Sequence, residues 1–337
     1  MFRLSRLATT ATVVAAAFTL LVPAAASAGE PTLSDPRALA NFNFDAGETP
    51  ENIALEPDGS ANVTLAHARQ VVRVDGHGTH RLLSVLPSVP DPNTPGIGAA
   101  VVTGIVRAKD GTLYVNYATG TSETGIWRIG PHGGTAVQIA QLPADSLPNG
   151  LALDEKRGVF YVADSARGLV WRVPLKGGTA TIWAAGSVLQ PLGESVGYEA
   201  GANGIKLHGD AVWVSNTDRW TLLRIPVRRD GTAGSIETRA TGLDGIDDFA
   251  FTGKDDTVLA ALITDSTIAH IRPDGTHDTA LTAPDGLSNP TAVALHDKTV
   301  YVTNASYFAV PPNPTVLTAH LTHDEDPDTS GGSGNRS

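Results

Sequence analysis

The 337-residue sequence has no cysteine, one methionine and only 18% charged residues. The lack of cysteine excludes a disulfide framework and a thiolate metal site. The low charge content, together with 41% hydrophobic residues, excludes a disordered chain and a coiled coil. After the N-terminal segment, no stretch approaches the roughly 20 apolar residues that a membrane-spanning helix needs. We therefore expect a globular fold with a large core.

The N-terminal segment has the features of a secretory signal peptide. Arg3 and Arg6 precede an apolar run that extends to about Pro23, and small residues suited to cleavage follow at Ala26-Ser27-Ala28. The two arginines are not adjacent, so general secretion is expected rather than the twin-arginine route. We predict that residues 1–28 are cleaved and that the protein is secreted to the extracellular space.

The mature chain is acidic. Removal of residues 1–28 leaves 22 basic and 35 acidic residues, so the formal charge changes from -11 to -13. Nucleic acids and anionic membranes bind cationic surfaces, so we expect neither as a partner. The charge is compatible with binding a cation. The sequence does not determine the oligomeric state, for which we expect a monomer.

A repeated phrase determines the predicted architecture. The chain contains 35 glycines and 22 prolines, which favours short strands joined by tight turns. Six copies of one phrase are present: Pro50-Glu51-Asn52-Ile53-Ala54-Leu55, Val102-Thr103-Gly104-Ile105-Val106-Arg107, Pro148-Asn149-Gly150-Leu151-Ala152-Leu153, Ala202-Asn203-Gly204-Ile205-Lys206-Leu207, Ile246-Asp247-Asp248-Phe249-Ala250-Phe251 and Pro290-Thr291-Ala292-Val293-Ala294-Leu295. Their spacing of 44 to 54 residues is close to the blade period of β-propellers.

Each copy continues as four short strands. In the third copy we predict strands at 151–154, 159–163, 169–173 and 180–184, separated by turns rich in Gly and Asp. The sequence therefore predicts an all-β fold, a six-bladed β-propeller of four-stranded antiparallel blades.

The sixth copy contains only three strands before the chain ends. We predict that 38–44 supplies its outer strand and closes the ring, because closure removes exposed sheet edges. The predicted domains are then a signal peptide at 1–28, a linker at 29–37, the propeller at 38–321 and a disordered tail at 322–337, which is acidic and rich in Gly and Ser.

The polar residue that leads each phrase should lie at one mouth of the central channel. These six residues all carry a side-chain oxygen: Glu51, Thr103, Asn149, Asn203, Asp247 and Thr291. Carboxylate and carboxamide oxygens suit Ca²⁺ better than zinc or copper, and magnesium prefers a tighter octahedron. The alternative is that asparagine before glycine merely favours the turn, while aspartate caps the start of the strand.

The segment LPNGLALDEKRGVFYVADSARGLVWRVPL at 147–175 and the repeated Asn-Gly phrase resemble the senescence marker protein/gluconolactonase (regucalcin-like) family of six-bladed propellers. The resemblance extends over about 50–321. It implies a metal site made of Glu51, Asn149 and the residue at 203. The resemblance also implies a general-base aspartate at the position where this sequence has Asn203.

The ligand pattern is more similar to that of two related calcium propellers, paraoxonase and diisopropyl fluorophosphatase. Their pattern of Glu, Asn, Asn and Asp implies that Glu51, Asn149, Asn203 and Asp247 hold a Ca²⁺ cofactor in the channel, and a second Ca²⁺ is possible. The implied catalytic residues are Asp247, as nucleophile or water-orienting base, and Glu51. Alternation along the strand should point Asp248 away from the metal, and its alternative role is a polar contact between blades.

Further residues are expected near the same mouth. The candidates for substrate binding are Thr103, His67, Tyr117, Asp164, Asn216, Thr291 and Asn304. A loop histidine is more often a solvated surface residue, and Asp164 and Asn216 are equally suited to ordering their loops. The long connections 87–100, 186–201 and 306–314 should form a lid or pocket wall on this face. Trp220, Tyr198, Tyr307 and Phe308 could supply apolar contacts there, although core packing is an alternative for each.

The predicted function is that of a secreted calcium-dependent hydrolase acting on a small-molecule lactone or ester. One alternative is a noncatalytic propeller that binds a protein, a glycan or a cell-wall component through the same face. Another is a lyase or biosynthetic cyclase, which would turn over substrate without incorporating solvent oxygen. The sequence leaves all three open, because one fold carries many functions.

Overall fold

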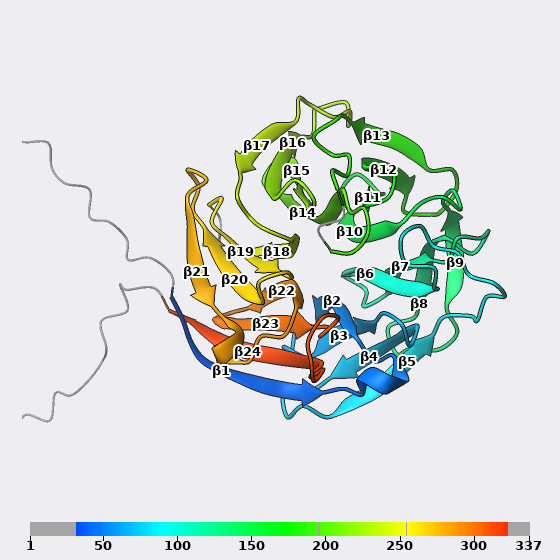
Figure 1. Ribbon diagram of the computed structural model, residues 1–337. Helices are drawn as coiled ribbons and strands as arrows, with labels where there is room; N and C mark the ends of the chain where they lie inside the picture. The colour runs from blue at the N-terminus through cyan, green and yellow to red at the C-terminus, as the bar shows by residue number, and fades with distance from the viewer. Residues whose placement is uncertain (1–31, 194–195, 254, 323–337) are drawn as a thin grey trace, which may run out of the picture. The chain divides into compact units, whose positions relative to one another are not determined.

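The computed structural model describes residues 32–193, 196–253 and 255–322, which form six four-stranded antiparallel sheets arranged around a central axis (Figure 1). This architecture is a six-bladed β-propeller, so the predicted fold class is confirmed. The signal peptide predicted at 1–28 and residues 323–337 of the predicted tail lie outside the described residues, whereas Thr322, predicted as the first residue of the tail, is the last residue of strand β24. None of the helices in the described ranges has the length and apolar character needed to cross a membrane.

The first three blades contain β2 to β13 in sequence order from the axis outward. Their strands are β2 (Pro50–Leu55), β3 (Ala61–Leu65), β4 (Gln70–Val74), β5 (His80–Val85), β6 (Val101–Arg107), β7 (Leu113–Ala118), β8 (Gly125–Ile129), β9 (Val137–Gln141), β10 (Pro148–Asp154), β11 (Val159–Asp164), β12 (Leu169–Pro174) and β13 (Thr181–Ala185). The four strands predicted for the third blade agree with β10 to β13 within three residues at each end.

The remaining blades contain β14 to β24 and the N-terminal strand. Their strands are β14 (Ala202–His208), β15 (Ala211–Asn216), β16 (Thr221–Pro226), β17 (Glu237–Ala240), β18 (Ile246–Phe251), β19 (Val258–Leu262), β20 (Thr267–Ile271), β21 (His277–Leu281), β22 (Pro290–His296), β23 (Thr299–Asn304), β24 (Thr315–Thr322) and β1 (Thr32–Asn41), with two short 3-10 helices, η1 (Phe44–Ala46) and η2 (Ala283–Asp285).

The N-terminal strand completes the last blade, as the sequence predicts. Strand β1 pairs antiparallel with β24, from Thr32 opposite Thr322 to Asn41 opposite Thr315. The strand begins at Thr32 rather than at Ala38, so most of the predicted linker at 29–37 is part of the sheet. The stretch is polar because an edge strand buries few of its side chains, so its composition resembles that of a linker.

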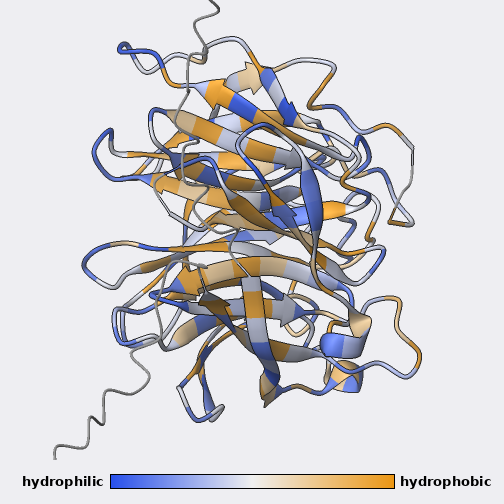
Figure 2. Cartoon of the chain, turned by 90° about the vertical axis from the view of Figure 1, so that its left-hand side faces the viewer, coloured by the Kyte–Doolittle hydropathy of each residue, from blue (hydrophilic) through white to orange (hydrophobic). Residues whose placement is uncertain are grey.

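The hydrophobic core lies between adjacent sheets. One cluster joins the third and fourth blades through Tyr161, Val170, Val214 and Leu223, all fully buried. Orange and blue bands alternate along several strands in Figure 2, which reflects the period-two pattern of side chains in a pleated strand. The blades are therefore held together mainly by apolar burial, which leaves the channel free for polar groups.

A β-bulge interrupts each inner strand near its start. In β18, for example, Ile246 pairs with Leu262 and Phe249 with Ala260, so one extra residue is inserted on the inner strand. Equivalent register shifts occur in β2, β6, β10, β14 and β22. A bulge redirects side chains next to it, and here it lies where the polar residues of the repeat enter the channel.

Candidate functional site

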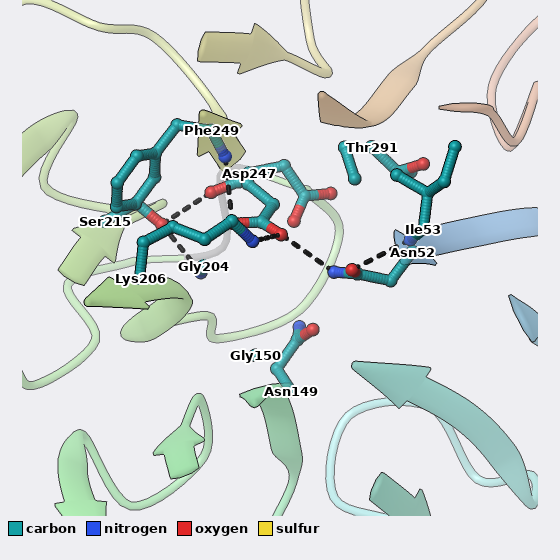
Figure 3. A network of polar contacts seen from close by, with 12 residues as sticks. Asn52, Ile53, Asn149, Gly150, Gly204, Lys206, Ser215, Asp247, Phe249 and Thr291 are labelled. Atoms are coloured by element: carbon teal, nitrogen blue, oxygen red, sulfur yellow. Dashed lines mark hydrogen bonds and ion pairs between the residues drawn. The ribbon is translucent and has the colours of Figure 1, made fainter. Parts of the chain in front are cut away.

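Four polar residues that lead their inner strands meet at one mouth of the channel. Glu51, Asn149, Asn203 and Asp247 all line a cavity of about 260 Å³, and each is at least nine-tenths buried. They come from β2, β10, β14 and β18, in four different blades. The structure therefore brings together the four residues that the sequence suggests as metal ligands. Figure 3 shows Asn149 and Asp247 beside the channel.

The walls of this cavity come from the long connections between strands. Ile97, Val196 and Tyr198 lie on two of these connections, and Tyr307 and Phe308 lie on a third. The long connections thus form a pocket wall, as expected. Trp220 does not line this cavity; it lies in a separate surface hollow.

Glu51 is held by a tyrosine that the sequence does not single out as a polar partner. The hydroxyl of Tyr307 donates a hydrogen bond to Oε2 of Glu51 at 2.6 Å. Burial raises the pKa of Glu51 from 4.5 to about 7, and repulsion from Asp248 adds to this, while the Tyr307 hydrogen bond acts in the opposite direction. Glu51 also lines the cavity that contains Asn149, Asn203 and Asp247.

The pKa of Asp247 is raised as well. Burial raises the pKa of this carboxyl well above its ordinary value, and repulsion from Glu51 and Asp248 raises it further, while Asn203 and Lys206 lower it. Two carboxyl groups that oppose each other's ionisation in a buried site are stabilised as anions by a bound cation. The electrostatics at this mouth therefore favour a cation.

The donor set fits Ca²⁺. The amide nitrogen of Asn203 donates to the Thr217 hydroxyl at 2.8 Å, which fixes the orientation of the side chain. Its amide oxygen, Oδ1, is buried without a partner among the described residues, as expected of an oxygen reserved for a ligand. Within the same part of the chain, no group of three His, Cys, Asp or Glu residues is suited to a metal, so any metal here depends on the amide oxygens of Asn149 and Asn203.

Two of the predicted substrate-binding residues also line the cavity. His67 lies in the wall, its Nδ1 is 3.2 Å from the Thr49 hydroxyl, and burial lowers its pKa. Its ring packs edge-on against Tyr307, 5.8 Å between centroids. The hydroxyl of Thr103 donates to the carbonyl of Pro148 at 2.7 Å, so Thr103 supports the start of β10 rather than presenting a free donor.

The other five predicted substrate-binding residues lie outside the cavity lining. They are Tyr117, Asp164, Asn216, Thr291 and Asn304, and each is buried and bonded within the protein scaffold. Asp164, for example, accepts hydrogen bonds from the Leu147 amide and the Trp171 indole. These five side chains therefore bind backbone or side-chain groups of neighbouring loops and strands and do not line the cavity.

A second polar layer lies in the channel directly below the mouth. Lys206 forms an ion pair with Oδ2 of Asp248, and the amide of Asn52 donates to the same oxygen at 2.9 Å (Figure 3). We call Asn52, Lys206 and Asp248 the channel network. Asp248 therefore makes a polar contact between blades, which is the alternative role considered for it above.

No protein-family model matches the chain, and no curated protein matches it in sequence. Solved structures do match over most of its length. The gluconolactonase XC5397 from Xanthomonas campestris superposes with a TM-score of 0.59 at 14% identity, covering 88% of this chain and 98% of the other. The calcium-binding protein regucalcin from Agrobacterium tumefaciens gives 0.59 at 16% identity, covering 84% and 93%.

Propellers with other activities are similarly close. The PQQ-bound aldose sugar dehydrogenase from Streptomyces coelicolor gives a TM-score of 0.61 at 14% identity, covering 87% of this chain and 99% of the other. Virginiamycin B lyase from Staphylococcus aureus gives 0.56 at 14% identity, covering 87% and 100%. The structural neighbours thus include the gluconolactonase and regucalcin-like propellers that the sequence resembles. At these identities the similarity shows the fold, so the reaction must be argued from the site.

Proposed function

We propose that this protein is a secreted calcium-dependent hydrolase of lactones or esters. The observation that carries the proposal is that two buried carboxylate residues and two buried asparagines line one cavity at the mouth of the channel. The similarity to gluconolactonase and regucalcin propellers supports the same interpretation. Secretion is part of the proposal and rests on the sequence of residues 1–28.

The residues at the mouth have different roles in the proposed reaction. Glu51, Asn149, Asn203 and Asp247 would hold Ca²⁺, which when bound polarises a substrate carbonyl oxygen and stabilises the charge that develops on it. Asp247 is the proposed nucleophile or base, which either attacks the carbonyl or accepts a proton from water. Tyr307 holds one oxygen of Glu51 through its hydrogen bond, and so orients the other toward the ion.

The cavity favours a small neutral substrate. Its wall is largely apolar, with Val101, Leu147 and Ile263 beside the long-loop residues, and no lysine or arginine of the described chain lines it. With Ca²⁺ offsetting the charge of Glu51 and Asp247, an anionic substrate would bring an unpaired charge into a largely apolar cavity that has no cationic side chain to pair with it. We therefore expect uncharged lactones and esters to be better substrates than their carboxylated analogues.

A lyase is the second candidate, because the virginiamycin B lyase propeller is similar in fold. A lyase breaks a bond by elimination, so its product gains no oxygen from water, whereas a hydrolase adds one. Turnover in ¹⁸O-labelled water followed by mass spectrometry of the product separates the two. A noncatalytic propeller would give no turnover of any substrate with or without Ca²⁺.

The first test is calcium binding to the purified protein after chelation, measured by calorimetry for the wild type and for Glu51→Gln. We expect one tight site in the wild type, with at least tenfold weaker binding in the variant, because a ligand carboxylate has been lost. A panel of neutral lactones and aryl esters is then assayed with Ca²⁺ and with excess chelator. Absence of binding by the folded wild type would overturn the proposal.

A further inference from the structure

The channel network lies immediately behind the two candidate carboxylate ligands. Asn52 follows Glu51 on β2, and Asp248 follows Asp247 on β18. In the other four blades the corresponding residue is small: Gly104, Gly150, Gly204 and Ala292. At this position of the phrase, a longer polar side chain therefore occurs in the two blades that supply a carboxylate to the mouth.

The contact between these two side chains crosses the channel. Nδ2 of Asn52 donates to Oδ2 of Asp248 at 2.9 Å, and these residues belong to the first and fifth blades, which are not neighbours in the ring. The other oxygen of Asp248 accepts from the Phe249 amide at 2.8 Å, and Oδ1 of Asn52 accepts from the Ile53 amide at 2.9 Å. Each side chain is thus hydrogen-bonded to the backbone amide of the next residue as well as to the other side chain.

Space for this contact is provided by a glycine. A Cβ added at Gly204 would lie 2.6 Å from Oδ1 of Asp248. The Asp248 carboxylate therefore occupies the space that a side chain at position 204 of β14 would need. Lys206, two residues farther along β14, reaches the same carboxylate. It approaches from the opposite mouth, where it lines a hollow of about 800 Å³.

Charge balance in the second layer follows from this ion pair. The side chain of Asp248 is 2% exposed, so an unpaired carboxylate there would be costly. With Lys206 beside it the layer is neutral, and among the described residues that line the cavity the carboxylates are those of Glu51 and Asp247. Their combined charge matches that of one divalent cation.

We propose that Asp248 is a positioning residue of the cation site. Together with Asn52 it fixes the separation of the strands that carry Glu51 and Asp247, and together with Lys206 it keeps the layer below the ion neutral. The inference rests on the proposed calcium site and adds three residues to it that do not contact the ion. Residues behind a metal site that orient its ligands change metal affinity when they are replaced.

The test measures binding of Ca²⁺ by calorimetry and of Tb³⁺ by luminescence, with no activity assay. Asn52→Leu removes the crossing hydrogen bond at similar volume, and we expect affinity to fall at least tenfold. Asp248→Asn leaves the Lys206 charge uncompensated below the site, and we expect a larger loss. The double variant Asp248→Asn/Lys206→Met removes both charges. It should regain most of the calcium affinity that Asp248→Asn loses.

Lys176→Met, at an exposed turn away from the channel, is the matched control for loss of a lysine and should bind like the wild type. Each variant is checked for folding by circular dichroism in chelator. If Asp248→Asn does not fold, the ion affinity of Asn52→Leu alone tests the positioning role. Binding by the folded variants equal to that of the wild type would overturn the positioning role and leave the proposed function standing. A folded wild type that binds neither ion would overturn both.

Discussion

Asp247 lies where the cavity meets the channel, and its carboxylate is the group on which the proposed chemistry depends. Replacement by asparagine keeps the volume of the side chain but removes its charge and its capacity to accept a proton. We expect Asp247→Asn to lower kcat/KM for a neutral lactone by a factor of about 10²–10⁴, the usual contribution of a positioned base. Steady-state kinetics at saturating Ca²⁺ measure this loss.

Asp244→Asn is the matched control for this prediction. Asp244 lies three residues before Asp247, next to the same blade, but does not line the cavity. The control should keep the activity of the wild type within about twofold. Equal losses in the two variants would mean that the effect of Asp247→Asn comes from the local backbone rather than from the carboxylate.

Glu51 makes the stability of the metal-free protein depend on pH. Its folded-state pKa is raised from 4.5 to about 7, so between these values the folded state keeps a proton that the unfolded state loses. Stability therefore falls as the pH rises from about 4.5 to about 7, and this contribution is constant above pH 7. Without metal, Glu51→Gln should be more stable than the wild type at pH 8, by up to the order of 3 kcal/mol.

The measurement is the unfolding midpoint of both proteins in chelator at pH 5, 6, 7 and 8. At pH 8, calcium should make the wild type more stable than Glu51→Gln, because the ion stabilises the Glu51 carboxylate and the variant lacks that carboxylate. A difference between the two proteins that does not change with pH would show that Glu51 is not protonated in the folded metal-free state.

The sequence predicts the four candidate ligands of the site, but it does not predict the hydrogen bond that holds one of them. Glu51, Asn149, Asn203 and Asp247 hold equivalent positions in a repeat, so their meeting at one mouth follows from the period. The hydrogen bond between Tyr307 and Glu51 joins residues 256 positions apart. Tyr307 lies in a long connection that has no counterpart in the repeat, so the pattern holds no information about its partner.

At the scale of strands, the sequence predicts where the blades lie but not how their inner strands begin. The alternation of apolar and polar residues fixes a strand and its buried face. A bulge breaks that alternation, and six inner strands contain one. The expectation that Asp248 points away from the metal relied on regular alternation, whereas the bulge places its side chain in the channel, in the layer below Asp247.

The glycine at the third position of the repeated phrase allows consecutive inner strands to approach closely. A Cβ at Gly104 would lie 2.3 Å from the carbonyl oxygen of Asn149 in the next blade, a separation that real Cβ atoms do not show. Because Asn149 is a candidate ligand, we expect Gly104→Ala to disturb both packing and calcium binding. The predicted loss in the free energy of unfolding is about 3 kcal/mol, typical of overpacking a rigid site.

Urea unfolding in chelator measures this loss. Gly76→Ala is the control, since a Cβ at Gly76 meets nothing within 4 Å, and its effect should stay within about 0.5 kcal/mol. A small effect at Gly104 would mean that the blades can separate slightly without cost, and that close approach is not the reason for the glycine.

At the scale of the whole molecule, β1 completes the ring. A chain that begins at residue 42 lacks this strand and exposes the edge of β24, whereas a chain that begins at residue 32 keeps it. Seven paired positions are lost in the shorter chain, and each backbone hydrogen bond contributes about 1 kcal/mol. We expect its unfolding midpoint to be lower by about 5 °C or more.

Thermal unfolding and light scattering of the two chains test this expectation. The exposed edge is a template for pairing with another chain, so the shorter chain should also aggregate on heating at lower temperature. Identical midpoints for the two chains would show that the closing strand is dispensable for the ring.

The pairing of Thr32 with Thr322 also sets an order of events in synthesis. Five blades are built from consecutive strands, and each can form as soon as its own segment has been made. The sixth cannot, because its outer strand β1 is made before the other five blades and its partner β24 is made after them. During translation β1 therefore stays unpaired until β24 has been made, so the ring closes only after the other five blades have been synthesised.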